Sequence, residues 1–565
     1  MVFDIKTVRP FAQPRLRAAV ALALTLAVTA ACGKPAPPLG QVSARAPGET
    51  RPNILVITVD HLGPELGAYG DPAAVTPNID RLAREGVRFV NAYAASGGED
   101  AETAALLTGV HPSTIGVVQE WTASLPQWTV APPPEVKAWP EALRARGYYT
   151  FHVGVRRDPF GSPASLWDDD ETQAGRIWPR GAIAQPFAGM IDLSALAGPE
   201  ATPAQRTLFD RLAFWRRAGH PAEERSVVDA RRISVPPYLP DTPETRAALK
   251  AEYDRDHRID DEVGAILSRL EKAGLLNSTV VIFTAKTGPA QPRAERTVYD
   301  AGVHVPLIAR WPDLRGHGGV RRDLVSGVDL APSVLRLAGA PAFAWMQGRD
   351  RLTDASAPAR FAFTVQDRID AVYERAFAVR DGRFLYVLDL APQTPLSALM
   401  RPGPLTDALT AARKAGRLTP AQAQLFSDQR PEAELYDLST DPGAQHDLAR
   451  DQAHAGDLKR LAEALNGFAT SAPDMTVATS QDLLDSYKPG GVTPVTAAPT
   501  AAMQAGRVAL STATPGAAIL WRLSDKGGWR LYTAPIAMGQ ATSLQARAIR
   551  YGFVESPRTA LPATR

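Results

Sequence analysis

The chain has 565 residues, of which 45% are hydrophobic and 22% are charged. These fractions are ordinary for a globular protein and exclude a collagen, a coiled coil and a wholly disordered chain, and the length predicts about two to four domains. The formal net charge of +2 provides no electrostatic footprint for nucleic acid, and the single cysteine excludes an internal disulfide and a cysteine-rich zinc site.

The N-terminal segment has the pattern of an export signal. Four basic residues precede a 14-residue apolar run over residues 18–31. This run is shorter than the roughly 20 residues that a transmembrane helix needs, but it has the length of a signal-peptide core. We therefore predict that residues 1–31 are a signal peptide and that residues 32–52, rich in Pro, Gly and Ala, are a flexible tether.

The only cysteine, Cys32, directly follows the apolar run. The residues before it resemble the lipobox of bacterial lipoproteins, in which the cysteine is acylated and becomes the first mature residue. An ordinary signal peptide is the alternative, because Thr29 stands where an aliphatic residue is usual. Removing residues 1–31 leaves 58 basic and 59 acidic residues, so a second, polybasic anchor is not expected. The expected location is the bacterial cell envelope, on the outer membrane or the periplasmic face, with the membrane bound through lipid.

The first part of the body alternates strand and helix signals. Residues 53–60 (NILVITVD) are an apolar run that ends in an acid, which is typical of a buried parallel strand with a ligand site beyond its carboxyl end. Thr76 is the expected N-cap of a helix with Pro77 in its first turn, and Gly86 suits the position after its end. Residues 87–91 predict a strand, and residues 104–107 predict the start of a helix.

The pattern continues after an irregular stretch over residues 155–240. A long helix is expected to follow Thr242 and Pro243 and to end near Gly274, with Val263, Ile266, Leu267 and Leu270 on one face. Residues 279–284 and 305–309 predict further buried strands. Strands that alternate with helices predict an α/β fold with a doubly wound sheet.

The C-terminal part has a different composition. Residues 473–499 are rich in Pro, Gly, Thr and Ala, and we predict a linker over residues 466–492. Residues 508–559 alternate apolar and polar positions between turn signals, which predicts a small β-sandwich over residues 493–565. Trp521 and Trp529 in this segment suit stacking on a sugar, although aromatic residues in strands also serve as core.

The body resembles the sulfatase family over about residues 51–465. The resemblance is carried by collinear blocks that include RPNILVITVDHLGPELGAYGD, TPNIDRLAREGVRFVNAYAAS, ALLTGVHP, VVIFTAKTG, YDAGVHVPLIARWP and AELYDLSTDP. It implies the alkaline-phosphatase-like fold over residues 53–465, with a smaller C-terminal α+β subdomain over about 360–465. The tail resembles the small β-sandwich of the chitobiase C-terminal type.

The resemblance also implies a mechanism. Sulfatases use a formylglycine hydrate, made from Cys or Ser beside a helix N-terminus, with an Arg four residues later. They hold one Ca²⁺, occasionally Mg²⁺, with Asp and Asn oxygens, and Lys and His residues complete the anion clamp.

The nucleophile position is substituted in this chain. The family pattern A-Y-x-x-S-x-x-C-x-P-x-R-A-A-L-L-T-G aligns without a gap with residues 92–109, AYAASGGEDAETAALLTG. Glu99 stands at the nucleophile and Thr103 at the Arg, while Ser96 falls on the family's own upstream Ser. The sequence therefore predicts that no formylglycine forms here.

The metal positions are substituted as well. The family's Asp-Asp-Leu-Gly is Asp60-His61-Leu62-Gly63, and its Ser-Asp-His/Asn-Gly is Ala285-Lys286-Thr287-Gly288. Of the four implied ligands only Asp60 is kept, while His61, Lys286 and Thr287 replace the others, so no metal cofactor is expected. Other clamp positions map near residues 155–157, Ala197 and Glu295.

These substitutions leave three interpretations. The first is a catalytically degenerate envelope lipoprotein that binds glycans or an envelope protein, with an internal ion pair from Lys286 to Asp60 and Glu99 in place of metal and substrate. The second is a sulfuric- or phosphoric-ester hydrolase whose remodelled site uses Asp60, His61, Glu99 and Asp100 as metal ligands or as acid and base. The third is a carbohydrate-binding protein that acts through its tail. Asp60 and the acidic residues around Glu99 also suit purely structural roles.

Overall fold

The computed structural model describes residues 46–118, 129–154, 159–171, 178–179, 183–194, 227–369, 372–523, 528–538 and 543–562. The predicted signal peptide, Cys32 and most of the tether lie outside these residues, as do residues 155–157 and Ala197. In the described part of the chain, no helix is both long enough and apolar enough to cross a membrane.

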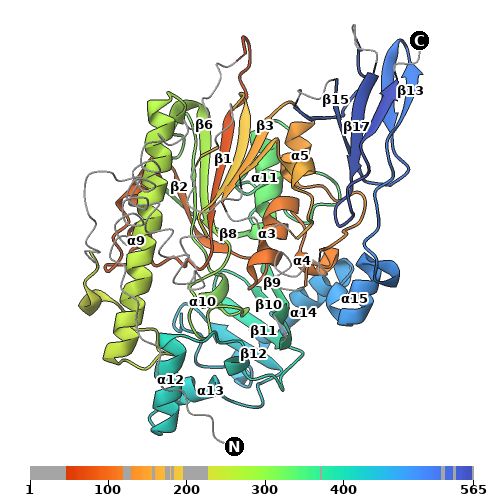
Figure 1. The fold of residues 1–565 in the computed structure, drawn as a ribbon. Coiled ribbons are helices and arrows are strands. Elements are labelled where there is room, and N and C mark those ends of the chain that lie inside the picture. The colour runs from red at the N-terminus through yellow and green to blue at the C-terminus, as the bar shows by residue number, and fades with distance from the viewer. Residues whose placement is uncertain are drawn as a thin grey trace, which may run out of the picture.

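The centre of the body is an eight-stranded sheet with the order β4-β3-β5-β1-β6-β7-β2-β8 (Figure 1). Strands β3, β4, β5, β1 and β6 pair in parallel, whereas β7 is antiparallel to both β6 and β2. The predicted α/β sheet is therefore confirmed as a mixed sheet, because the chain between β6 and β7 forms no crossover helix longer than α10 (Asp300–Val303). The strands are β1 (Asn53–Val59), β2 (Val87–Tyr93), β3 (Tyr149–Gly154), β4 (Asp169–Glu171), β5 (Phe187–Asp192), β6 (Thr279–Ala285), β7 (Leu307–Arg310) and β8 (Gly319–Ser326).

Helices cover both faces of this sheet (Figure 1). The helix α9 (Pro243–Lys272) packs with α2 (Pro77–Glu85), and α3 (Glu99–Thr108), α5 (Trp139–Arg144) and α11 (Leu330–Leu337) pack with one another. Two one-turn helices, α4 (Pro112–Ile115) and α6 (Pro163–Leu166), belong to the same body. One hydrophobic core joins these helices to the strands, and β1 and β6 are buried along their whole length.

The long helix forms as its sequence signals predict. The Thr242 hydroxyl caps α9 by accepting the Thr245 N–H at 3.2 Å, and the predicted apolar face is buried. The helix α3 begins at Glu99, five residues before the expected start at residue 104. Its first turn is acidic and has no apolar spacing, so local periodicity does not mark it, although the family resemblance places a helix N-terminus beside Glu99.

The ends of α2 differ from the expectation. The Thr76 side chain does not cap the helix; instead the Asp260 carboxylate of α9 accepts the N–H groups of Asn78 and Ile79. Gly86 is extended, with φ −126° and ψ −155°, rather than left-handed. A Cβ at Gly86 would lie 2.4 Å from the Ala309 carbonyl oxygen, so close backbone approach is what requires glycine here.

A second, four-stranded antiparallel sheet with the order β12-β11-β10-β9 forms the smaller subdomain below the main sheet in Figure 1. Its strands are β9 (Ala362–Ile369), β10 (Val372–Arg380), β11 (Phe384–Asp389) and β12 (Ala433–Asp437), with helices α12 (Pro404–Lys414), α13 (Pro420–Gln424) and α14 (Ala455–Ser471). The segment 466–492, predicted as a linker, instead contains the end of α14 and the helix α15 (Ser480–Tyr487). The α15 residues Leu483 and Tyr487 are buried in the core of the body, which is why this Pro- and Gly-rich stretch is ordered there.

The C-terminal segment forms two antiparallel sheets, β13-β14 and β16-β15-β17-β18. Their strands are β13 (Thr500–Gln504), β14 (Arg507–Ser511), β15 (Ala518–Arg522), β16 (Arg530–Leu531), β17 (Ser543–Ile549) and β18 (Thr559–Pro562). A separate apolar cluster that includes Val508, Ile519 and Ala546 lies between them. The predicted β structure is present, and the likeness to the chitobiase C-terminal type stays a prediction.

Candidate functional site

Three charged side chains meet at the carboxyl edge of the main sheet. Asp60 directly follows β1, Asp192 ends β5 and Lys286 directly follows β6. Strand β1 lies between the other two in parallel register, with Thr58 beside both Asp192 and Thr284. The carboxyl ends of parallel strands share one edge, so this topology brings together residues that are distant in sequence.

Lys286 forms two ion pairs inside the protein. Its Nζ lies 2.7 Å from Asp60 Oδ1 and 2.7 Å from Asp192 Oδ2, and its side chain is 0% exposed. The Lys286 backbone N–H donates to the Val59 carbonyl at 2.8 Å, which fixes the start of the side chain beside β1. A buried cation is tolerable only with such partners, and here it has two carboxylates.

These residues do not fit a calcium ion. Ca²⁺ needs about six to eight oxygen ligands, and the resemblance places it beside Asp60. The Lys286 ammonium instead stands between the Asp60 and Asp192 carboxylates, where it would repel a divalent cation. The Thr287 hydroxyl accepts the His61 backbone N–H at 3.3 Å, a bond that joins two loops.

A second cluster surrounds the first residue of α3. His61 Nε2 lies 3.2 Å from Glu99 Oε1, and His61 Nδ1 lies 3.8 Å from Glu295 Oε1. Arg401 from the smaller subdomain forms a short ion pair with Glu295 and lies 3.8 Å from Glu99 Oε1. His61, Glu99 and Glu295 offer ligand atoms within 4.8 Å of one another, and the two ring nitrogens of His61 face different carboxylates.

The environment of His61 favours its neutral form. Burial lowers the pKa of His61 to about 4, against the opposing effect of Glu99 and Asp60. Its backbone is left-handed, with φ 58°, and its carbonyl accepts from Arg255 Nη2 at 2.8 Å. A neutral imidazole carries no charge, so the 3.2 Å approach of His61 Nε2 to Glu99 Oε1 is a polar contact rather than an ion pair at neutral pH.

The other residues of α3 have structural contacts. The Thr103 hydroxyl donates to the Glu99 carbonyl at 2.7 Å within the helix, so it does not replace a guanidinium. Glu102 Oε2 accepts the Ala95 N–H at 2.7 Å and holds the preceding loop. Asp100 is fully buried beside them. Burial raises the pKa of Glu102 well above its ordinary value.

Sequence reasoning identified five of the residues in these clusters but not all of their partners. The expected pairing of Lys286 with Asp60 is present, but its second acid is Asp192 rather than Glu99, because β5 lies next to β1. Glu99 pairs with His61 and Arg401 instead. An apolar run that ends in an acid, FAGMID over residues 187–192, is the signal that would have found Asp192. No local pattern marks Arg401.

Comparison with solved structures supports the fold. A structure of a 2-O GAG sulfatase matches with a TM-score of 0.53 and 20% identity, and covers 75% of this chain and 93% of its own. At this identity the match bears on the fold alone. It agrees with the mixed sheet flanked by helices and the smaller C-terminal subdomain described above.

Comparison of sequences identifies the family. The family model of the Sulfatase domain matches residues 52–162 and 218–340. The chain is 30% identical over 541 residues to an ulvan-active sulfatase of Formosa agariphila, covering 90% of each chain. It is also 29% identical over 447 residues to human arylsulfatase A, covering 70% of this chain and 83% of that protein. The chain therefore belongs to the sulfatase family.

Proposed function

We propose that this sulfatase-family protein is catalytically degenerate and acts by binding at the cell envelope, without a metal cofactor. The observation that carries the proposal is the Lys286 ammonium, 2.7 Å from both Asp60 and Asp192. It supplies the positive charge that a metal ion supplies in the family, and it cannot act as an exchangeable Lewis acid.

The nucleophile position supports the same proposal. Glu99 provides an anion at the N-terminus of α3, where a sulfate group would need to approach. Its side chain is 2% exposed, and the Arg401 guanidinium 3.8 Å away already offsets its negative charge within the protein. A second anion at this position is disfavoured by charge and by space.

Metal content and ester hydrolysis test this proposal directly. The mature protein, purified without chelators and offered Ca²⁺, Mg²⁺, Mn²⁺ and Zn²⁺, is expected to retain no stoichiometric metal in elemental mass spectrometry. It is also expected to hydrolyse neither sulfate nor phosphate esters above background. About one metal per chain that is lost in Asp60→Ala, or turnover that is lost in Glu99→Gln, would show that the proposal is wrong.

A hydrolase with a remodelled site is the second candidate, favoured by the position of His61 between Glu99 and Glu295. Such a group can act as general acid and base when its pKa is near the working pH. The pKa of His61 near 4 makes it a weak base at neutral pH, which is why this candidate ranks second. It requires turnover in the ester panel that His61→Asn abolishes, while Lys250→Met on the surface of α9 leaves it unchanged.

We further propose that acylated Cys32 anchors the protein to the bacterial membrane, on the outer-membrane or periplasmic side. The support is the apolar run before Cys32 and the absence of a later apolar run of 18 residues in the sequence. Wild-type protein expressed in a Gram-negative host is expected in the detergent-soluble membrane fraction, and Cys32→Ala is expected in the aqueous fraction or as unprocessed precursor. An identical distribution of the two proteins would exclude the lipid anchor.

A further inference from the structure

One arginine reaches from the smaller subdomain into the central site. Arg401 lies three residues before α12, and its carbonyl accepts the Thr406 hydroxyl at 2.7 Å. Its guanidinium forms the short ion pair with Glu295 and lies 3.8 Å from Glu99 Oε1. Both acids belong to the body, so the cation and the carboxylates that hold it come from different parts of the fold.

The backbone of the two acids is positioned by contacts within the body. The Glu99 carbonyl accepts the Thr103 hydroxyl at 2.7 Å on α3, a helix that is buried along its whole length. The Glu295 N–H donates to the Gln291 carbonyl at 3.0 Å in the loop between β6 and α10. The body therefore holds both acids in place, and only the guanidinium between them is supplied by the smaller subdomain.

His61 adds a third polar group to this site. Its side chain is 3% exposed, and Nδ1 has no hydrogen-bond partner in the described part of the chain. Nδ1 lies 3.8 Å from Glu295 Oε1, and both atoms are acceptors when the proton of the neutral ring is on Nε2. Buried polar atoms in native proteins are as a rule hydrogen-bonded, so this nitrogen requires a donor. A group with several N–H donors, such as a guanidinium, suits two acceptors at this separation.

Arg401 is the most exposed member of the cluster. Its side chain is 14% exposed, against 2% for Glu99 and 5% for Glu295. Solvent therefore reaches the cluster on the side of the guanidinium, and withdrawal of this one side chain would open the carboxylates to a cation from solution. Buried carboxylates without a cation are strongly unfavourable, so a cation from solution is favoured once Arg401 leaves.

We propose that Glu99, Glu295 and His61 form a binding site for a small organic cation with a guanidinium group, and that Arg401 occupies this site from within the chain. Carboxylates bind guanidinium groups through charge-assisted hydrogen bonds, as the ion pair of Arg401 with Glu295 illustrates. The ligand and Arg401 compete, so the affinity is reduced by the fraction of molecules in which Arg401 is withdrawn. The inference names the ligand class of the proposed binding function and rests on it.

Removal of the Arg401 side chain tests the proposal, with methylguanidinium as the probe. The full mature chain is used with Cys32→Ala, so that lipid does not contribute, and affinity is measured by calorimetry. Arg401→Ala is expected to bind methylguanidinium roughly tenfold more tightly than the chain that keeps Arg401, because the internal competitor is gone. Urea has a similar planar shape without the charge and is expected not to bind.

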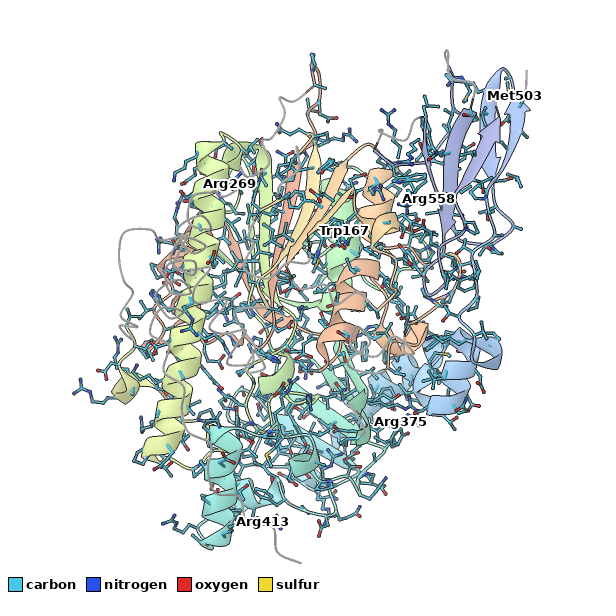
Figure 2. All side chains as sticks on the ribbon, in the orientation of Figure 1. Trp167, Arg269, Arg375, Arg413, Met503 and Arg558 are labelled. Atoms are coloured by element: carbon cyan, nitrogen blue, oxygen red, sulfur yellow. The ribbon has the colours of Figure 1, made fainter. Side chains whose placement is uncertain are left out.

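Arg413→Ala is the matched control. Arg413 is an exposed arginine on α12, near the bottom of Figure 2, and its guanidinium carbon lies 4.6 Å from the ring centre of Phe426. This variant is expected to bind methylguanidinium as the chain with Arg413 does. Adding Glu295→Gln to Arg401→Ala is expected to weaken binding roughly tenfold, because a charged acceptor is lost.

Several results would overturn the proposal. They are equal affinity in Arg401→Ala and Arg413→Ala, equal binding of urea and methylguanidinium, and a chain with Arg401 that never binds the probe. Uptake of a divalent metal by Arg401→Ala in place of methylguanidinium would do so as well. Thermal unfolding shows whether each variant is folded, and Arg401→Gln, with the same expected gain, serves if Arg401→Ala does not fold. The metal analysis and ester panel on wild-type protein test the proposed function separately.

Discussion

Replacing Lys286 by methionine is expected to destabilise the protein by about 3–5 kcal/mol, because it leaves the Asp60 and Asp192 carboxylates buried without their shared cation. Methionine is close to lysine in length, so the loss reports charge rather than a cavity. The measurement is equilibrium unfolding in denaturant, followed by tryptophan fluorescence and by circular dichroism.

The control for this substitution is Lys250→Met. Lys250 is also a lysine paired with an acid, Asp254 at 2.9 Å, but its side chain is 29% exposed. An exposed pair of this kind contributes about 0–1 kcal/mol. A Lys286→Met variant that loses no more stability than Lys250→Met would mean that the three charges do not form a buried cluster.

A triple variant tests whether the charges or the shapes of these three side chains stabilise the site. With Lys286→Met, Asp60→Asn and Asp192→Asn combined, the site is uncharged, and most of the lost stability is expected to return. Failure to recover would indicate that the side chains are needed for their shape rather than for charge neutralisation. Recovery would show that the ion-pair cluster adds no net stability.

Lowering the pH from 8 to 5 is expected to destabilise wild-type protein by about 2 kcal/mol more than the His61→Asn variant. In the unfolded chain His61 titrates near its ordinary pKa of 6.5, while burial lowers its pKa to about 4 in the folded protein. The unfolded state therefore binds more protons between these values. The contribution of His61 is fully present above pH 6.5 and is lost as the pH falls toward 4.

Asparagine is the appropriate replacement, because the backbone of His61 has φ 58° and asparagine tolerates the left-handed region. The readout is the difference between the two unfolding free energies as a function of pH, which cancels the titration of other buried groups. Parallel curves for wild type and variant would show that the pKa of His61 is the same in the folded and the unfolded protein. That result would strengthen the acid–base candidate for the central site.

The sequence correctly predicted those elements that are marked by residues close together in the chain. The apolar run before Asp60, the cap at Thr242 and the apolar face of α9 all predict structure that is present, because each depends on residues within a few positions of one another. The positions of Glu99 and Lys286 followed from ungapped blocks on either side. Hydrophobic periodicity did not predict the start of α3, because the first turn of this helix has no regularly spaced apolar residues.

By itself, then, the sequence determined the family resemblance and the type of most main elements, and it predicted which catalytic positions of the family are substituted. Only the tertiary structure decided which charges meet. Asp192 reaches Lys286 because β5 lies beside β1, Arg401 reaches Glu99 because the smaller subdomain packs on the main sheet, and Asp260 caps α2 from another helix. The physical reason is that propensity and periodicity act over neighbouring residues, whereas the partner of a buried charge is set by how distant segments pack.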